Sequence, residues 1–370
     1  MDTTTQKICV YAICKNEIKF VNRWLSSLSP EADYIVVLDT GSTDGTYEFL
    51  SSDPRVTKVE QKIITPWRFD SARNESLKLI PADATICVIA DFDHIFRPGW
   101  GAELKRLFDE GYEEVYGDII DYDDNNEEIK RFLSKNVHPN RPEWYWERPI
   151  HEHVRYHGDG VIMEYTSDNF VIEHHPDRTK SRGSYLGLLE AEYKENSTDP
   201  YCAIYYGCEL CFHGRVEEGN DVFLKGYNEC DFTDLPEVGY RLCLNLADYY
   251  HNDKVDLDEA LKWMERAAEF GLKTRNLYVM WADIYSHKGD YIQAKHKLLE
   301  AFNVKVNVKG WVENNDYFRG IVEDKLALTF YTLHDYVSAV AYGSLALEYN
   351  PEDERLQQNM RYYIEGMKNA

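Results

Sequence analysis

The chain has 370 residues and a formal net charge of −24 at pH 7. Such an acidic balance argues against nucleic acid and anionic membrane surfaces as partners, because phosphate groups are bound by basic faces. No apolar run approaches the roughly 18 residues that a membrane-spanning helix requires, and a chain of this length is expected to form two domains.

The cysteines and the first residues indicate a reduced compartment. Eight cysteines are scattered along the chain, and several lie in apolar runs where a free thiol acts as a small buried hydrophobic group. Cys208 and Cys211 form a C-x-x-C pair without a second pair at zinc-binding spacing, so we expect a structural role. Residues 1–7 are polar and do not have the architecture of a signal peptide. We therefore expect a cytoplasmic protein.

The first third of the chain alternates between apolar runs and segments with helical spacing. An apolar run at residues 8–13 is followed by apolar positions at helical spacing over residues 18–28. The alternation continues through predicted strands at 34–38, 56–64 and 87–90 and predicted helices at 47–51 and 67–79. This order is typical of a βαβ series and predicts an α/β domain with a mostly parallel sheet.

Acidic residues follow these strands at one edge of the predicted sheet. Asp91 and Asp93 come directly after the fourth strand, and alternation places both on one face, where they repel each other unless a cation lies between them. The alternative is an acidic turn that caps the next helix. Glu17, Asp39 and Asp44 follow earlier strands at the same edge, which is where open α/β sheets bind ligands. No dinucleotide or P-loop glycine motif is present, so the acids predict a metal ion together with the ring and ribose of a nucleotide.

Four motifs carry a resemblance to a known family. They are VYAICKNE at residues 10–17, VLDTGSTDGT at 37–46, FDSARN at 69–74 and ADFD at 90–93. In this order and spacing they resemble glycosyltransferase family 2. The resemblance implies a GT-A fold, in which a Rossmann-like half binds a nucleotide-sugar and is joined to a half that binds the acceptor.

The resemblance also implies roles for individual residues. It implies an inverting transfer of a hexose or N-acetylhexosamine from a UDP-sugar, with Mn²⁺ or Mg²⁺ neutralising the diphosphate leaving group. Asp39 matches the acid that contacts the base, and Arg73 matches the basic residue that holds the nucleotide. Asp93 matches the direct metal ligand, and Asp91 belongs to the metal site and lies nearer the ribose. Phe92 is bulky for its position and would stack on the sugar or wall its pocket. The implied nucleotide-sugar site consists of Ala12, Cys14, Glu17, Asp39, Gly41, Asp44, Arg73, Asp91 and Phe92.

The middle of the chain concentrates histidines. We expect strands at 113–121 and 129–133, followed by a run in which His151 and His153 alternate around Glu152. In an extended strand both imidazoles face one way, and a dense run of histidines after paired acids predicts that one of them completes the metal shell. For each histidine the alternative is a surface or satisfied core position. The candidates are His151 and His153 first, with His157, His174 and His175 in the same run.

Glu152 is the first candidate for the catalytic base. Family members that carry a helical repeat tail show a His-Glu pair at this place, which His151 and Glu152 match. An inverting transfer needs a carboxylate that takes the proton of the acceptor. The neighbouring Trp144 and Trp146 offer flat surface for a sugar, or alternatively pack in the core.

From residue 184 onward the pattern is helical, with small residues that recur at a period of about 34 residues. Small residues at this period mark the helix crossings of tetratricopeptide repeats, which stack into a solenoid. Glycines at Gly207 and Gly219 are expected at tight crossings, and an insertion is expected near 307–310. We therefore expect a GT-A domain over residues 1–183 and a tetratricopeptide-like domain over 184–370. The recurring alanines are Ala247, Ala260 and Ala267, then Ala282, Ala294 and Ala301, and then Ala327, Ala339 and Ala346.

These features predict a metal-dependent glycosyltransferase whose architecture resembles bacterial peptide and protein glycosyltransferases. The expected acceptor is a Ser, Thr or Cys side chain of a polypeptide, and the alternatives are a glycan or a lipid-linked acceptor. A repeat-based scaffold with an inactive transferase domain is the non-enzymatic alternative, and the repeats are a candidate surface for a homodimer. A sugar nucleotidyltransferase would need a glycine-rich basic loop after the first strand, where this chain has Lys15 and no glycine.

Overall fold

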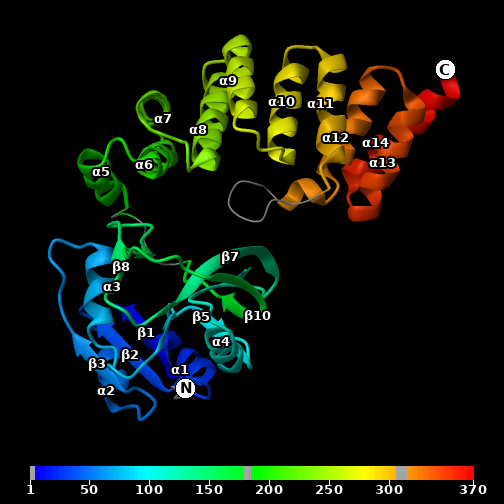
Figure 1. Ribbon diagram of the computed structural model, residues 1–370. Coiled ribbons are helices and arrows are strands. Elements are labelled where there is room, and N and C mark those ends of the chain that lie inside the picture. The colour runs from blue at the N-terminus through cyan, green and yellow to red at the C-terminus, as the bar shows by residue number, and fades with distance from the viewer. Residues whose placement is uncertain (1–4, 179–182, 184, 306–314) are drawn as a thin grey trace. The chain divides into compact units, whose positions relative to one another are not determined.

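The computed structural model describes residues 5–178, 183, 185–305 and 315–370. The chain divides into two compact units, Met1–Leu188 and Leu189–Ala370 (Figure 1). The first unit contains all the described strands, and the second is helical. The insertion expected near residues 307–310 lies outside the described residues. Within the described ranges, no helix is both long enough and apolar enough to cross a bilayer.

The first unit is organised around an eight-stranded sheet with the strand order β3-β2-β1-β4-β7-β6-β10-β5. The first four of these strands run parallel, as the alternation of apolar runs predicted. They are β1 (Ile8–Cys14), β2 (Tyr34–Asp39), β3 (Lys58–Gln61) and β4 (Ile86–Ile89). The helices between them are α1 (Ile18–Leu28), α2 (Thr46–Ser52) and α3 (Phe69–Leu77).

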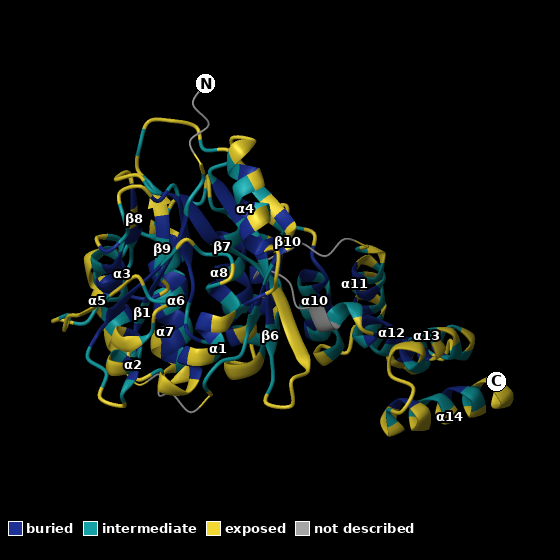
Figure 2. Cartoon of the chain, turned by 90° about the horizontal axis from the view of Figure 1, so that it is seen from below, coloured by how far each residue is buried: buried dark blue, intermediate teal, exposed yellow. Residues whose placement is uncertain are grey.

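The second half of the sheet has mixed strand directions. β4 pairs antiparallel with β7 (Glu128–Pro139), and β7 pairs antiparallel with β6 (Glu114–Tyr122), through a hairpin whose residues 124–131 are exposed (Figure 2). β6 then pairs parallel with β10 (Glu164–His174), and β10 pairs antiparallel with the short strand β5 (His94–Phe96). The sequence patterns predicted β6 and part of β7 but not β10. A separate hairpin joins β8 (Trp144–Glu147) to β9 (His153–Tyr156), and α4 (Trp100–Asp109) follows β5.

Hydrophobic clusters cover both faces of the sheet. Ile8 of β1 packs in one cluster with Trp24 of α1, whereas Tyr11 of the same strand packs in the opposite cluster. Trp144 and Trp146 of β8 belong to this second cluster and are 3% and 6% exposed. Both tryptophans are therefore core residues, which decides between the two roles that the sequence left open.

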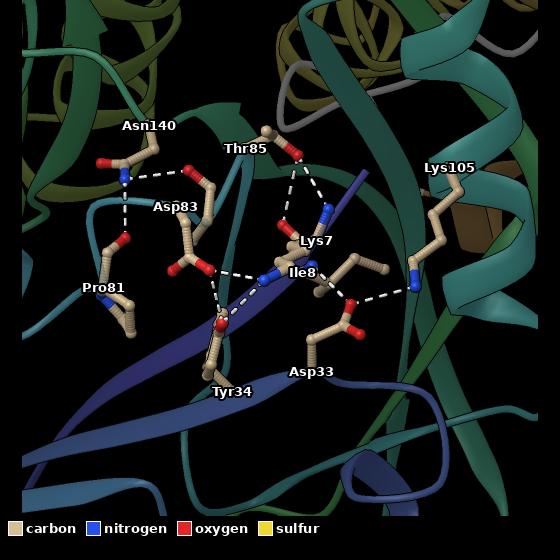
Figure 3. A network of polar contacts seen from close by, with 10 residues as sticks. Lys7, Ile8, Asp33, Tyr34, Pro81, Asp83, Thr85, Lys105 and Asn140 are labelled. Carbon is tan, nitrogen blue, oxygen red and sulfur yellow. Dashed lines mark hydrogen bonds and ion pairs between the residues drawn. The ribbon is translucent and has the colours of Figure 1, made fainter. Parts of the chain in front are cut away.

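A polar network holds the amino ends of the central strands together (Figure 3). Asp33 accepts a hydrogen bond from the amide of Ile8 at 2.8 Å and forms an ion pair with Lys105 of α4 at 3.0 Å. Asp83 accepts a hydrogen bond from the hydroxyl of Tyr34 at 2.8 Å. The network thus fixes β1, β2 and the start of β4 at the end of the sheet opposite to the carboxyl ends of these strands.

The second unit consists of consecutive helix pairs. Neighbouring helices pack α6 on α7, α8 on α9, α10 on α11 and α12 on α13. Capping aspartates recur at Asp256, Asp290 and Asp335, at spacings of 34 and 45 residues, and each begins the second helix of a pair. The helices are α5 (Tyr185–Glu195), α6 (Pro200–Phe212), α7 (Val216–Glu229), α8 (Pro236–Asp248), α9 (Leu257–Glu269), α10 (Arg275–His287), α11 (Tyr291–Asn303), α12 (Ile321–Thr332), α13 (Tyr336–Tyr349) and α14 (Glu354–Asn369).

Small residues lie where the helices cross. Ala282, Ala294 and Ala327 belong to one buried cluster in which each is at most 1% exposed. A Cβ atom added to Gly207 of α6 would lie 2.3 Å from the ring of Phe223 on α7, which is too close for any side chain. The predicted tight crossing at Gly207 is therefore confirmed, and the small-residue period reflects close approach of helices.

Candidate active site

Asp39 ends β2 at the carboxyl edge of the sheet and is fully buried. Its Oδ1 accepts hydrogen bonds from the Ser42 amide at 2.8 Å and from the Gly41 amide and the Gln61 side chain at 2.9 Å. Burial raises the pKa of Asp39, but the hydrogen bonds outweigh burial and hold the pKa below its usual value. Asp39 is thus an ionised acceptor whose hydrogen bonds shape the loop that follows β2.

The loop that follows β2 is built by two further predicted residues. Gly41 adopts a φ of +107°, a left-handed conformation that favours glycine. The thiol of Cys14, at the end of β1, lies 3.4 Å from Oδ2 of Asp39. Ala12 lies on the same strand and is fully buried in the core. These three residues therefore support the position of Asp39 rather than forming an open surface.

Asp44 and Glu17 organise the helix ends at this edge. Asp44 accepts hydrogen bonds from the Ile18 amide at 3.1 Å and the Thr46 amide at 3.0 Å, so it satisfies the first residues of both α1 and α2. The carbonyl of Glu17 accepts the first bond of α1 from the Phe20 amide at 2.8 Å. The structure therefore assigns structural contacts to both predicted site residues.

Arg73 of α3 is the centre of an ion-pair cluster, formed by Arg73, Asp91 and Glu152. Arg73 is 5% exposed. Its guanidinium lies 2.7 Å from Oδ1 of Asp91 and 3.2 Å from Oε1 of Glu152, and it lies over the ring of Trp146 at 5.0 Å. Burial raises the pKa of Asp91, but Arg73 outweighs this effect and lowers it below its usual value. Burial raises the pKa of Glu152 above its usual value, against the opposing charge of Arg73. Three predicted site residues are thus in direct contact.

Asp93 belongs to a metal-ligand cluster, formed by Asp93, His94 and His174. Each side chain offers one ligand atom, and the three atoms lie within 4.8 Å of one another. Oδ2 of Asp93 lies 3.3 Å from Nε2 of His174. The amide of His175 donates to the Asp93 carbonyl at 2.9 Å, which fastens the turn that carries Asp93 to the end of β10.

Strand register creates the metal-ligand cluster. His174 of β10 is paired with His94 of β5 on one side and with Asp121 of β6 on the other, so the three residues form one row across three strands. Oδ1 of Asp121 lies 3.1 Å from Nδ1 of His174. Burial lowers the pKa of His174, but the hydrogen bond and charge of Asp93 outweigh burial and raise it. The row therefore places an imidazole between two carboxylates.

The donor set of the cluster fits a divalent cation. Asp93 and His174 are partly open to solvent, with side chains 27% and 25% exposed, so an ion and further oxygen ligands can reach them. Imidazole ligands together with a carboxylate suit a transition metal such as Mn²⁺ better than Mg²⁺, which prefers oxygen ligands. The sequence assigned both Asp93 and Asp91 to the metal site; Asp93 lies in the metal-ligand cluster, whereas Asp91 forms an ion pair with Arg73.

The first two histidine candidates lie elsewhere. Nε2 of His153, on β9, is 3.8 Å from Glu147 of β8, and His151 adopts a φ of +53° in the turn before β9. The cluster around Asp93 instead contains His174, which the sequence placed in the same histidine run, and His94. Among the described residues, the possible ligand atoms gathered with Asp93 come from His94 and His174, and the identity of the metal-ligating histidine stays a prediction.

Phe92 faces away from the two acids that flank it. It is 3% exposed and stacks on Trp24 of α1 with 4.3 Å between ring centroids. Its ring therefore belongs to the core between the sheet and α1 and not to the wall of a sugar pocket.

His94 and Asp121 are the residues of this edge that the sequence analysis did not single out. The available signal was their position, since His94 directly follows the Asp91–Asp93 turn and Asp121 closes the predicted strand at 113–121. Their proximity to His174 depends on pairing between strands that are distant in the sequence. No local pattern in the sequence specifies that pairing.

Comparisons with known proteins find a matching family model and a similar protein. Residues 9–178 match the model of the family described as Glycosyl transferase family 2. A protein of Synechococcus elongatus described as a TPR repeat-containing protein is 24% identical over 282 residues, which cover 71% of this chain and 66% of that protein. The chain therefore spans slightly less than two thirds of this relative.

Solved structures of tetratricopeptide repeat proteins are similar to part of the chain. YrrB, described as a TPR protein with an unusual peptide-binding site, is 14% identical and covers 50% of this chain and 86% of its own, with a TM-score of 0.40. A thermophilic TPR protein of Thermus thermophilus is 18% identical and covers 49% of this chain and 90% of its own, with a TM-score of 0.31.

Proposed function

Because residues 9–178 of this chain belong to glycosyltransferase family 2, we propose that it is a metal-dependent, inverting glycosyltransferase with a UDP-sugar as donor. The transferred group is a hexose or an N-acetylhexosamine, and the acceptor is a polypeptide side chain. The observation that carries the proposal is the pair of adjacent clusters at the carboxyl edge of the sheet. One holds Arg73 against Asp91, and the other gathers ligands for a cation around Asp93.

In this proposal the two clusters bind different parts of the donor complex. In the proposed complex Arg73 and Asp91 hold the nucleotide and its ribose, and Asp93, His94 and His174 hold a divalent cation, with Mn²⁺ favoured by the imidazoles. The bound cation would neutralise the charge that develops on the diphosphate as it leaves. Arg73 adds a second, fixed positive charge on the same edge.

Glu152 is the proposed general base. The acceptor oxygen or sulfur attacks the anomeric carbon from the side opposite the diphosphate, the bond from that carbon to the UDP oxygen breaks, and the acceptor proton passes to the Glu152 carboxylate. Support comes from the position of Glu152 beside Asp91 and Arg73, its largely buried side chain and its raised pKa, since a base is most effective when its pKa approaches the working pH.

The polypeptide acceptor is supported by the helical unit. Stacked helix pairs form extended surfaces that commonly bind other polypeptides, and a relative that aligns with 71% of the chain is described as a TPR repeat-containing protein. A glycan or a lipid-linked acceptor is the competing proposal within the same reaction. An acceptor-free assay leaves this choice open and tests the donor alone.

The test is slow hydrolysis of a panel of UDP-sugars by the full chain, measured as released UDP with Mn²⁺, with Mg²⁺ or with EDTA. We expect one UDP-sugar to be hydrolysed, with Mn²⁺ more effective than Mg²⁺ and no release in EDTA. Release from GDP- or TDP-sugars in place of UDP-sugars would overturn the donor class. Equal release in EDTA would overturn the metal dependence.

A further inference from the structure

We propose that Asp121 is a positioning residue that fixes the tautomer and the orientation of His174 for metal binding. The inference rests on the proposed metal-dependent function. It adds a residue that is neither one of the paired acids, Asp91 and Asp93, nor a proposed ligand of the cation. Asp121 itself touches neither the donor nor the cation in this proposal, because it acts through the imidazole of His174.

The geometry comes from the parallel pairing of β6 and β10. Asp121 and His174 are direct partners in register, so their side chains leave the sheet on the same face, where paired strands lie about 4.8 Å apart. Oδ1 of Asp121 lies 3.1 Å from Nδ1 of His174, and Nε2 of the same ring lies 3.3 Å from Asp93. The imidazole therefore lies between two carboxylates, with one ring nitrogen within ion-pair distance of each.

The chemistry follows from what a carboxylate can do. An ionised carboxylate only accepts hydrogen bonds, so Asp121 favours the tautomer of His174 in which Nδ1 carries the proton. That tautomer leaves the lone pair of Nε2 directed toward Asp93, where a cation would bind. Carboxylates that hold a metal-binding imidazole in this way raise metal affinity, and their loss typically weakens binding about 10- to 100-fold.

The neighbour of Asp121 on β7 is directed toward another side chain. Lys130 of β7 is its partner in register on the opposite side, but the Lys130 ammonium lies over the ring of Phe132 at 5.2 Å. The side chains of Asp121 and His174 are 21% and 25% exposed, so their contact is only partly screened by water. The pairing with His174 is thus the contact that the structure assigns to Asp121.

The experiment measures Mn²⁺ affinity of the full chain by calorimetry, with Mn²⁺ as the titrant. We expect Asp121→Leu to weaken Mn²⁺ binding about 10- to 100-fold, and Asp121→Asn to retain affinity within about threefold, because the amide oxygen still accepts from Nδ1. Asp118→Leu is the matched control. Asp118 lies on the same strand three residues earlier, faces the other side of the sheet and pairs with the exposed Arg131, so its loss should leave Mn²⁺ binding unchanged.

A double-mutant cycle separates positioning from a general structural role. In the His174→Ala background, Asp121→Leu should have no further effect on Mn²⁺ affinity, because the imidazole on which it acts is gone. Equal weakening in both backgrounds would overturn the positioning role, and so would wild-type affinity in Asp121→Leu. If Asp121→Leu does not fold, Asp121→Ala takes its place in the cycle.

The outcomes also separate this inference from the proposed function. If the wild-type chain does not bind Mn²⁺, the metal-dependent function and the role of Asp121 are both overturned. If the wild type binds Mn²⁺ and depends on Asp93, but no Asp121 variant changes the affinity, only the role of Asp121 is overturned.

Discussion

The two clusters at the carboxyl edge of the sheet satisfy their charges in opposite ways. In the ion-pair cluster, Arg73 is surrounded by Asp91, Glu152 and the ring of Trp146, so positive and negative groups of the protein balance one another. In the metal-ligand cluster, Asp93 meets imidazoles whose ring nitrogens are natural ligands. The ion pairs of the first cluster form as the chain folds, although Nη1 of Arg73 has no hydrogen-bond partner among the described residues. The second cluster gathers ligand atoms that an added cation would bind.

This difference predicts that the clusters fail differently when they are mutated. Loss of a residue from the ion-pair cluster should be visible in stability without any ligand. Loss of Asp93, whose side chain is 27% exposed, should be visible mainly when a cation or donor is added.

The largest expected effect is that of Asp93→Ala on donor hydrolysis. Removal of the carboxylate should lower UDP-sugar hydrolysis at least about 100-fold and abolish the rise in melting temperature that Mn²⁺ gives the wild type. Unfolding without Mn²⁺ should be nearly unchanged. Asp124→Ala, at an 85% exposed side chain, is the control and should retain full activity. An Asp93→Ala chain that keeps its response to Mn²⁺ would place the cation elsewhere.

The second effect is that of Arg73→Met on stability without ligand. This change leaves Glu152, whose side chain is 14% exposed, beside an unpaired Asp91. Breaking a buried ion pair costs about 3–5 kcal/mol, and we expect the lower end because Asp91 is 41% exposed. Urea unfolding measures the loss.

Arg55→Met is the matched control for Arg73→Met. Arg55 pairs with Asp53 at the same 2.7 Å distance, but it is 28% exposed, whereas Arg73 is 6% exposed, so water screens this pair more and its loss should cost about 1 kcal/mol. Equal losses for the two arginines would remove the distinction between the buried ion-pair cluster and this partly exposed pair.

The smallest effect is the pH dependence set by Glu152. Its pKa is raised above 4.5 by burial, so the folded state holds an extra proton between the unfolded and folded pKa values. Stability should therefore fall as the pH rises through this window. Activity should change in the opposite direction, because the base acts in its ionised form, and kcat should fall as the pH drops through the raised pKa.

Glu152→Gln tests this assignment through the pH profile of the residual activity. The acidic limb of the kcat profile should disappear in the variant, while UDP binding is retained. An unchanged acidic limb would assign the titration to another group.

The parallel half of the sheet was predictable because local patterns specify it. The apolar runs that became β1, β2 and β4 are buried on both faces, so they are visible as continuous hydrophobic segments. The acids follow those runs directly, so their position at one edge required no knowledge of the remaining fold. The small-residue period of the helical unit was readable for a similar reason, since each repeat contacts mainly its neighbours.

The rest of the site depends on pairings that no local pattern encodes. His174 meets its partners because β10 lies between β6 and β5 in the sheet. β5 is a three-residue edge strand that pairs with the end of β10, although β10 comes much later in the sequence. Phe92 had a usable signal, because the alternation that places Asp91 and Asp93 on one face directs the residue between them to the other. The family resemblance instead suggested contact between Phe92 and the sugar, but the ring packs on Trp24.

The polar network at the amino ends of the strands has a consequence for motion. Asp33 and Asp83 tie the starts of β1, β2 and β4 to their surroundings (Figure 3). We therefore expect this end of the sheet to be its most rigid part. The opposite edge, which bears Asp39, Asp91 and Asp93, is held by separate side-chain and turn contacts and not by this network. Amide hydrogens near Ile8 and Ile86 should exchange most slowly, and the catalytic edge can adjust to a donor without loosening the register beneath it.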